Sequence, residues 1–196
     1  MDTLLAAHIQ IKKVFAPEHG FRGDADAGET IRNGKDYPHG ELPILSPFTV
    51  KIRKPTSPHS LQDIDLIVFD IQDVGARFYT YISTMQYVME ACAENRKQLV
   101  ITDRPNPCDY VDGPVRQKNQ KSFVGMHAIP ILHGCTVGEL AQMINGEGWL
   151  PNGKKMHVDR HSRGRLKHGQ PYSLPVKPSP TCPTTRQLPY ILHSAV

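Results

Sequence analysis

A short apolar run that stops at a carboxylate most constrains what this chain can fold into. Residues 66–69 read Leu-Ile-Val-Phe, and an uninterrupted apolar run of this length predicts a strand buried on both faces of a sheet. Asp70 ends the run, and a polar turn with Gln72, Asp73 and Arg77 follows it. Because ligands of open α/β sheets bind beyond the carboxyl ends of the strands, this stretch predicts a functional site.

Strands and helices are expected to alternate along the chain. Short apolar runs predict further strands at residues 9–16, 99–102, 129–132 and 156–158. Helical spacing of apolar residues predicts a helix at residues 81–94, and a capping box at Thr136 and Glu139 predicts the start of another. Prolines predict an extended, irregular connection at residues 38–58 and an irregular segment at residues 175–183. A short helix that closes at Leu61 is expected before the strand at residues 66–69. This alternation predicts an α/β fold with a largely parallel sheet.

Composition places the chain among ordinary globular proteins. Its 196 residues suffice for one domain with a core, and a hydrophobic content of 39% excludes a wholly disordered chain. No apolar run reaches the length of a membrane span, so we expect no membrane insertion. The N-terminus lacks the basic leader and apolar core of a signal peptide. It reads as the end of a helix, and we therefore expect the natural beginning of the chain to be missing.

Positive charge is concentrated late in the chain. The net charge is +4, and residues 151–170 hold six lysines and arginines against Asp159 alone. Aromatic side chains that could stack on bases are not interleaved with these charges, which favours a solvated basic loop over a nucleic-acid site. The four cysteines form no CxxC pair, which argues against a zinc ribbon.

Polar clusters follow four of the predicted strands. They are Glu18, His19 and Arg22; Asp70, Asp73 and Arg77; Asp103, Arg104 and Asn106; and His133. If these strands are parallel, all four clusters lie at the same edge of one sheet. This convergence is the main indication, from the residues themselves, of a functional site.

The carboxylates in these clusters allow more than one interpretation. Glu18 can serve as a general acid in a partly dry pocket, or it can cap a helix or hold its loop together. Asp70 and Asp73 can supply a general base or bind a metal ion. Alternatively, Asp73 pairs with Arg77 and Asp70 caps the next turn. Asp70 and Asp73 have two residues between them and so do not form a DxD motif, and no HxH or HExxH motif is present, so support for a metal site is weak.

The remaining candidates also have structural alternatives. Asp103 is expected to hold a rigid turn, Asn106 can present its amide to a sugar, and His133 alone is typical of a structural histidine. Tyr79 and Tyr81 can offer flat faces to a sugar ring or pack in the core. No GxGxxG, Walker A or GxSxG motif is present, which argues against nucleotide binding and against an α/β-hydrolase.

Six motifs, taken together and in order, resemble one known family. They are PEHGFRG at residues 17–23, FDIQDVGARFYTY at 69–81, DRPNP at 103–107, YVDGP at 110–114, SFVGMH at 122–127 and HGCTVGELAQMINGE at 133–147. The chain is similar, over residues 14–150, to the DUF1343 or YbbC-like family, which includes the NamZ exo-β-N-acetylmuramidases. The stretch LPVKPSP at residues 174–180 is a weaker match.

The resemblance implies a glycoside hydrolase that removes N-acetylmuramic acid from the non-reducing end of peptidoglycan glycans. It implies a Rossmann-like catalytic domain at residues 1–150 and a basic, proline-rich remnant of a C-terminal domain at residues 151–196. The family's proposed catalytic acid corresponds to Glu18, and Asp70 or Asp73 could supply the base. The expected substrate-binding residues are His19, Arg22, Gln72, Arg77, Tyr79, Asp103, Arg104, Asn106 and His133. An arginine suits the lactyl carboxylate of muramic acid, and Arg22 or Arg77 is expected in that role.

Departures from the family leave other functions open. Family members are longer, and we expect this chain to lack their first strand and nearly all of their C-terminal domain. It could therefore be a non-catalytic peptidoglycan-binding module or an inactive fragment. A third hypothesis is a metal-dependent hydrolase that uses Asp70, Asp73 and His133. The resemblance implies no cofactor, muramyl saccharides rather than nucleic acid as partners, and a periplasmic or secreted location.

Overall fold

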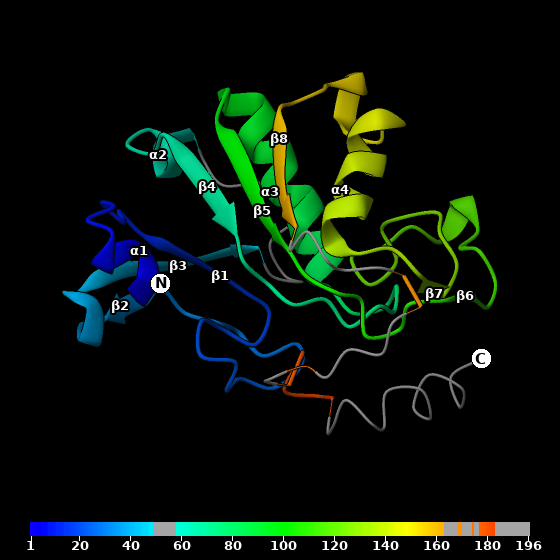
Figure 1. Ribbon diagram of the computed structural model, residues 1–196, viewed down its shortest axis with the longest axis horizontal. Coiled ribbons are helices and arrows are strands. Elements are labelled where there is room, and N and C mark those ends of the chain that lie inside the picture. The colour runs from blue at the N-terminus through cyan, green and yellow to red at the C-terminus, as the bar shows by residue number, and fades with distance from the viewer. Residues whose placement is uncertain (49–57, 163–167, 170–173, 175–176, 183–196) are drawn as a thin grey trace. The chain divides into compact units, whose positions relative to one another are not determined.

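Two compact units make up the chain, Met1–Ile64 and Asp65–Val196. The computed structural model describes residues 1–48, 58–162, 168–169, 174 and 177–182 (Figure 1). Residues 177–182 of the irregular segment expected at residues 175–183 form no helix or strand, as predicted, and residues 175, 176 and 183 lie outside the described residues. The sequence predicts a domain boundary between residues 150 and 151, which does not coincide with the boundary between these two units. That domain boundary stays a prediction.

The first unit holds a small mixed sheet. Its strands β1 (Val14–Pro17), β3 (Leu42–Phe48) and β2 (Gly34–Asp36) lie in that spatial order, with β1 parallel and β2 antiparallel to β3 (Figure 1). The short helices are α1 (Asp2–Ala6), η1 (Tyr37–His39) and α2 (Pro58–Leu61). β1 is shorter than the strand expected at residues 9–16, whereas the short helix closing at Leu61 is confirmed.

β3 contradicts the irregular connection that its prolines predicted. Proline has no N–H to donate, so strands accept it where their pairing ends or is interrupted. Pro43 lies opposite Lys35 in the pairing of β3 with β2, but it precedes Ile44, where the pairing of β3 with β1 begins. Pro47 falls in the interval where the register of that pairing shifts, between Phe15 and Pro17 of β1. Residues 49–57 of the predicted connection lie outside the described residues.

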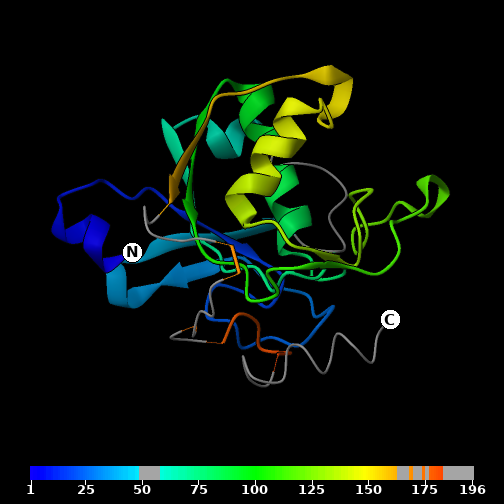
Figure 2. The ribbon, with the colours of Figure 1, turned by 45° about the vertical axis from the view of Figure 1, so that its right-hand side comes forward.

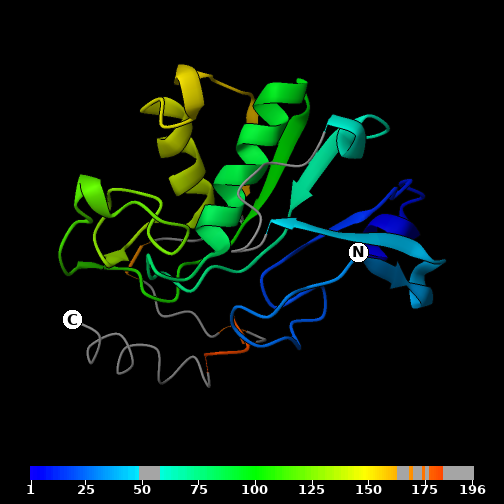
Figure 3. The same cartoon turned by 180° about the vertical axis from the view of Figure 1, so that it is seen from behind.

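The second unit is built on a parallel sheet. β4 (Leu66–Phe69), β5 (Gln98–Asp103) and β8 (Val158–Ser162) lie in that order, and both neighbouring pairs are parallel. Helix α3 (Tyr81–Asn95) lies between β4 and β5 in the chain, and α4 (Val137–Gly146) lies between β5 and β8. Both helices cover the same side of this sheet (Figures 2 and 3). The expected α/β fold with a parallel sheet and flanking helices is confirmed.

Only one face of β4 is buried. Ile67 and Phe69 are buried, whereas Leu66 and Val68 are 43% and 40% exposed. Successive side chains of a strand point to opposite faces, and α3 and α4 cover only one of them. The prediction of a strand buried on both faces is therefore wrong.

Local sequence signals place both helices of the second unit. In α3, the side chains of Ile82, Met85 and Met89 are fully buried at helical spacing, as predicted. Before α4, the Thr136 hydroxyl accepts the Glu139 N–H at 3.2 Å, and the Glu139 carboxylate accepts the Thr136 N–H at 2.9 Å. The predicted capping box is confirmed.

A two-stranded antiparallel ribbon accompanies the parallel sheet. It consists of β6 (Val111–Asp112) and β7 (Leu132–His133), and the second of these overlaps only the end of the strand expected at residues 129–132. The 3₁₀ turns η2 (Lys118–Gln120) and η3 (Pro151–Gly153) lie in the connections. β8 overlaps the strand expected at residues 156–158 only at Val158, the first residue of β8. Among the described residues, no helix has the length and apolarity needed to span a bilayer.

Candidate active site

Two of the four predicted clusters meet at the carboxyl edge of the parallel sheet. Asp70 follows β4 and Arg104 follows the neighbouring β5, and their side chains form an ion pair. The Thr102 hydroxyl donates a hydrogen bond to the same carboxylate oxygen, Oδ1 of Asp70. The side chains of Asp70 and Arg104 are 50% and 38% exposed. This edge therefore presents a charged pair to solvent, at the position where α/β sheets bind ligands.

The other two clusters belong to other sheets. Glu18 follows β1 in the first unit, and His133 lies in the antiparallel ribbon. The expectation that all four clusters share one sheet edge is therefore wrong. His133 nevertheless reaches Asp73, because Leu132 forms a β-bridge with Ala76 of the turn that follows Asp73.

Asp73 and His133 form a buried ion pair. His133 Nε2 lies 3.2 Å from Asp73 Oδ2, and the two side chains are 1% and 4% exposed, respectively. The same oxygen accepts the Gly75 N–H at 2.9 Å. The alternative pairing of Asp73 with Arg77 is not formed, because the Arg77 guanidinium instead donates to the carbonyl groups of Pro114 and Ile129. The charge of Asp73 is thus buried and is paired with the buried side chain of His133.

Near this pair, two neighbouring histidines, His133 and His127, have different charges at neutral pH. Burial alone would lower the pKa of His133, but its contacts with Asp73 and Cys135 outweigh burial and raise that pKa to about 9. Burial, with a smaller contribution from the charge of His133, lowers the pKa of His127 to about 4. At neutral pH His133 is therefore the cation and His127 is neutral. The His127 ring lies 6.0 Å, between centroids, from that of Trp149.

Gln72 and Asn106 use their amide groups to fix the turns around Asp73. Gln72 Nε2 donates to the carbonyl groups of Asp73 at 2.9 Å and of Pro105 at 3.0 Å. Asn106 Nδ2 donates to the carbonyl group of Cys135 at 2.9 Å, and its Oδ1 accepts the N–H of residue 108 at 2.8 Å. These amides therefore position the loops, and their use in binding a sugar stays a prediction.

Asp103 anchors the start of α4. Its carboxylate accepts the Thr136 hydroxyl at 2.9 Å and the Gly138 N–H at 2.8 Å, and it forms an ion pair with Arg160 of β8. A carboxylate is favourable at a helix N-terminus, where the backbone N–H groups are unpaired. These contacts agree with the interpretation that Asp103 holds local structure together.

The aromatic residues after Gly75 divide between the core and the surface. Tyr81 is buried, and Tyr79 packs against a core cluster of Val74, Ala76, Cys108, Leu132 and Cys182. Burial raises the pKa of the Tyr79 hydroxyl, against the opposing effect of a hydrogen bond with Thr181. The ring of Phe78 is 37% exposed and lies 5.5 Å from that of Tyr79. Phe78 is thus the more exposed flat face of this turn.

In the first unit, Glu18 and His19 form a buried turn at the carboxyl end of β1. They are 8% and 6% exposed, respectively. The Gly28 N–H donates to Glu18 Oε1 at 3.0 Å, and His19 Nδ1 lies 2.9 Å from the carbonyl oxygen of Ala25. His19 has a φ of 72°, in the left-handed region, which costs free energy for a residue other than glycine. Local contacts therefore hold the Glu18 carboxyl group in place.

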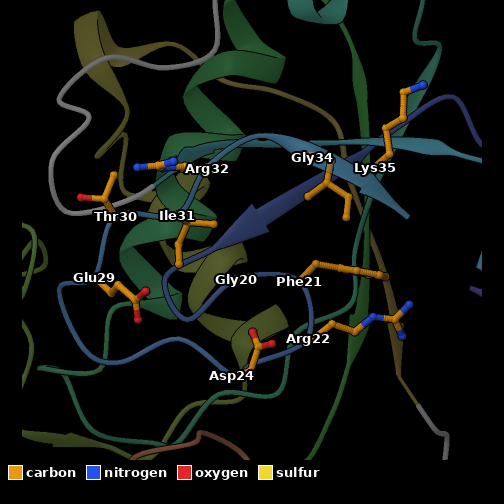
Figure 4. Close-up of a pocket in the computed structure, with 11 residues that line it drawn as sticks. Gly20, Phe21, Arg22, Asp24, Glu29, Thr30, Ile31, Arg32, Gly34 and Lys35 are labelled. Carbon is orange, nitrogen blue, oxygen red and sulfur yellow. The ribbon is translucent and has the colours of Figure 1, made fainter. Parts of the chain in front are cut away.

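A pocket of about 830 Å³ lies beside this turn (Figure 4). Its lining is formed by Gly20, Phe21, Arg22, Asp24, Glu29, Thr30, Ile31, Arg32, Gly34, Lys35 and Ile44. Arg22 makes an ion pair with Asp36, and its guanidinium lies 4.9 Å from the centre of the Phe21 ring. Of the predicted site residues of this unit, Arg22 alone lines the pocket.

Sequence reasoning missed two kinds of residue at these sites. The acidic residues Asp24 and Glu29 line the pocket, and the acidic, glycine-containing loop that follows residue 23 was the available signal. Thr102 holds Asp70 through a contact 32 residues apart in the chain, for which no local signal exists. Within the described part of the chain, no group of three or more His, Cys, Asp or Glu side chains is arranged to hold a metal ion.

Comparisons with known proteins agree with this fold and these motifs. Residues 1–186 match the family model described as exo-β-N-acetylmuramidase NamZ, N-terminal. The chain is 41% identical over 178 residues to the peptidoglycan β-N-acetylmuramidase NamZ of Bacillus subtilis, and the match covers 90% of this chain and 42% of that protein.

Solved structures give the same result. Crystal structures of two DUF1343 family proteins from Bacteroides fragilis each match with a TM-score of 0.77, at 41% and 37% identity. Each match covers 95% of this chain but only 48% and 47% of those chains, so this chain spans about half the length of the relatives it matches. The family model covers nearly all of the sequence, and the chain therefore belongs to the NamZ family of DUF1343 proteins, matching its N-terminal domain.

Proposed function

We propose that this chain carries the catalytic acid of a glycoside hydrolase that removes N-acetylmuramic acid from the non-reducing end of peptidoglycan fragments. The observation that carries the proposal is the placement of Glu18, buried at the end of β1 with its carboxyl group bound by the Gly28 N–H. The name of the Bacillus subtilis relative, which is 41% identical, supports the choice of substrate. In this role, the Glu18 carboxyl group donates a proton to the oxygen of the leaving group.

Asp70 fits the second carboxylate of such a reaction better than Asp73 does. Asp73 is buried, and its Oδ2 already contacts both His133 and Gly75. Asp70 is half-exposed and uses only Oδ1 to accept from Thr102 and Arg104. Since no further partner of Asp70 is found in the described part of the chain, its Oδ2 can hold a water molecule. We therefore assign to Asp70 the role of the base.

Hydrolysis of para-nitrophenyl β-N-acetylmuramic acid tests the proposal. Glu18→Gln removes the proton donor with little change in shape, and we expect kcat to fall by about 100-fold or more. Glu147→Gln, which changes an exposed glutamate after α4, is the matched control and should retain full turnover. Turnover that survives Glu18→Gln would refute the role of Glu18.

Absence of turnover would separate the proposal from its alternative. If the folded wild-type chain binds muramyl saccharides saturably but hydrolyses none, it acts as a non-catalytic peptidoglycan-binding module. This alternative is retained because the match covers only 42% of the length of the Bacillus subtilis relative. Circular dichroism of each protein establishes that the chain under test is folded.

A further inference from the structure

Among the arginines that the structure describes, Arg104 is the one best placed to select the substrate. We propose that it binds the lactyl carboxylate of N-acetylmuramic acid and so distinguishes this sugar from N-acetylglucosamine, which lacks that group. This inference rests on the proposed function and adds to it the residue that determines specificity. Arginine suits the task, because its planar N–H groups match the two oxygens of a carboxylate.

The other arginines that the structure describes in the second unit are occupied or distant from the carboxyl edge. Arg77 donates to two backbone carbonyl groups, and Arg116 donates to three. Arg160 forms ion pairs with Asp103 and Glu139. Arg96 precedes β5 and therefore lies toward the opposite edge of the sheet. Arg77, expected from the sequence to meet the lactyl group, is thus committed to backbone contacts.

The two arginines described in the first unit fit the role less well. Arg22, the other residue expected to meet the lactyl group, also makes one ion pair, but its partner Asp36 is buried, so sharing its guanidinium with a ligand would cost more than at Arg104. Arg32 lines the pocket beside β1, but so do the carboxylates of Asp24 and Glu29, which would repel an anion (Figure 4). Arg32 is therefore the rival that an experiment has to exclude.

Arg104 combines a fixed orientation with free hydrogen-bond donors. Its Nη2 donates to Asp70 Oδ1, which the Thr102 hydroxyl also holds. No second partner of Arg104 is found among the residues that the structure describes, and its side chain is 38% exposed. A guanidinium has five N–H donors, so the contact with Asp70 leaves donors for a bidentate contact with a ligand.

The charges around Arg104 also allow an anion to bind. Asp73 is neutralised by His133, and Asp103 is neutralised by Arg160. Of the carboxylates in the described ranges, Asp70 is the one that contacts Arg104 directly, and it is half-exposed, so water screens its repulsion of a ligand. An exposed ion pair of this kind contributes little stability, and sharing its guanidinium with a ligand therefore costs little.

Equilibrium binding tests the inference without requiring turnover. The ligands are the methyl β-glycosides of N-acetylmuramic acid and of N-acetylglucosamine, measured by calorimetry with the wild-type chain and with Arg104→Gln, Arg32→Gln and Arg96→Gln. Arg104→Gln should weaken binding of the muramic acid glycoside by tenfold or more and leave binding of the glucosamine glycoside unchanged. Arg104→Lys keeps the positive charge but lacks the paired N–H donors of a guanidinium group. It should therefore weaken binding of the muramic acid glycoside by an intermediate amount. Arg96→Gln, which removes the same charge elsewhere, should change neither affinity.

Three outcomes would overturn the inference. They are equal weakening of both ligands by Arg104→Gln, loss of discrimination in Arg32→Gln instead, and a wild-type chain that does not prefer the muramic acid glycoside. None of them depends on hydrolysis. The effect of Glu18→Gln on turnover tests the proposed activity separately. A negative result for Arg104 in the binding assay would therefore leave the proposed glycosidase activity unaffected.

Discussion

The buried pair of His133 and Asp73 should make stability depend on pH in the mildly alkaline range. The pKa of His133 is raised from an ordinary 6.5 to about 9 in the folded chain, because its contacts with Asp73 and Cys135 outweigh the effect of burial. A raised pKa means that the folded state binds the proton more tightly than the unfolded state. The stabilisation is therefore fully present below pH 6.5 and is lost as the pH rises through 9. At about 1.4 kcal/mol per pKa unit, it amounts to at most about 3 kcal/mol.

Urea unfolding at pH 6 and at pH 9.5, for the wild type and His133→Gln, measures this contribution. The single tryptophan, Trp149, reports on the second unit by its fluorescence. At pH 6 the variant should be less stable by about 3 kcal/mol, because Asp73 is left buried without its partner. At pH 9.5 most of this difference should vanish.

Two other histidines need separate treatment in this experiment. His127, with a pKa of about 4, stays neutral over the whole range. Contacts with Asp109 and Glu139 raise the pKa of His168 to about 9, but its side chain is 57% exposed, so its effect on stability should be small. His168→Gln is therefore the control. A stability difference between His133→Gln and the wild type that is the same at both pH values would refute the reasoning.

Two further substitutions test contacts that hold the candidate site in place. Gly75→Ala should lower the free energy of unfolding by about 3 kcal/mol or more, because the added Cβ would lie 2.1 Å from Asn106 Oδ1 and φ is +89°. Gly40→Ala is the control, because Gly40 has a φ of +80° but open space around it, so this substitution should cost only the backbone strain of about 1 kcal/mol. An equal loss of unfolding free energy in both variants would contradict the steric argument. Thr136→Val should cost about 1–2 kcal/mol in urea unfolding, since it removes both the cap of α4 and a hydrogen bond to Asp103; an unchanged midpoint would contradict this role.

The sequence predicted the elements whose signals are local. The spacing of apolar residues places α3, and the reciprocal contacts of Thr136 and Glu139 place the start of α4. The strand β2 was missed because it has three residues and no apolar pattern. The exposure of Leu66 could not be predicted, since the arrangement of both helices on one side of the sheet is a property of the whole unit.

The candidate site was predictable as a set of loops but not as a set of contacts. Polar residues after β4 and β5 were expected to meet because neighbouring parallel strands share an edge, and Asp70 and Arg104 do meet there. The partner of Asp73 is His133, which is 60 residues further along the chain, in the ribbon of β6 and β7. No spacing rule reaches that far, and local spacing indicates only the pairing of Asp73 with Arg77.

These long-range contacts divide the candidate residues by what remains free to meet a ligand. Gln72, Asn106 and Arg77 use their side chains on backbone carbonyl groups, and such residues hold loops in the geometry that a site requires. Asp70 and Arg104 keep exposed groups at the carboxyl edge of the sheet. Substitution in the first group should therefore change stability together with ligand binding. Substitution of Arg104 should change binding alone, because the exposed pair that it forms with Asp70 contributes little to folding.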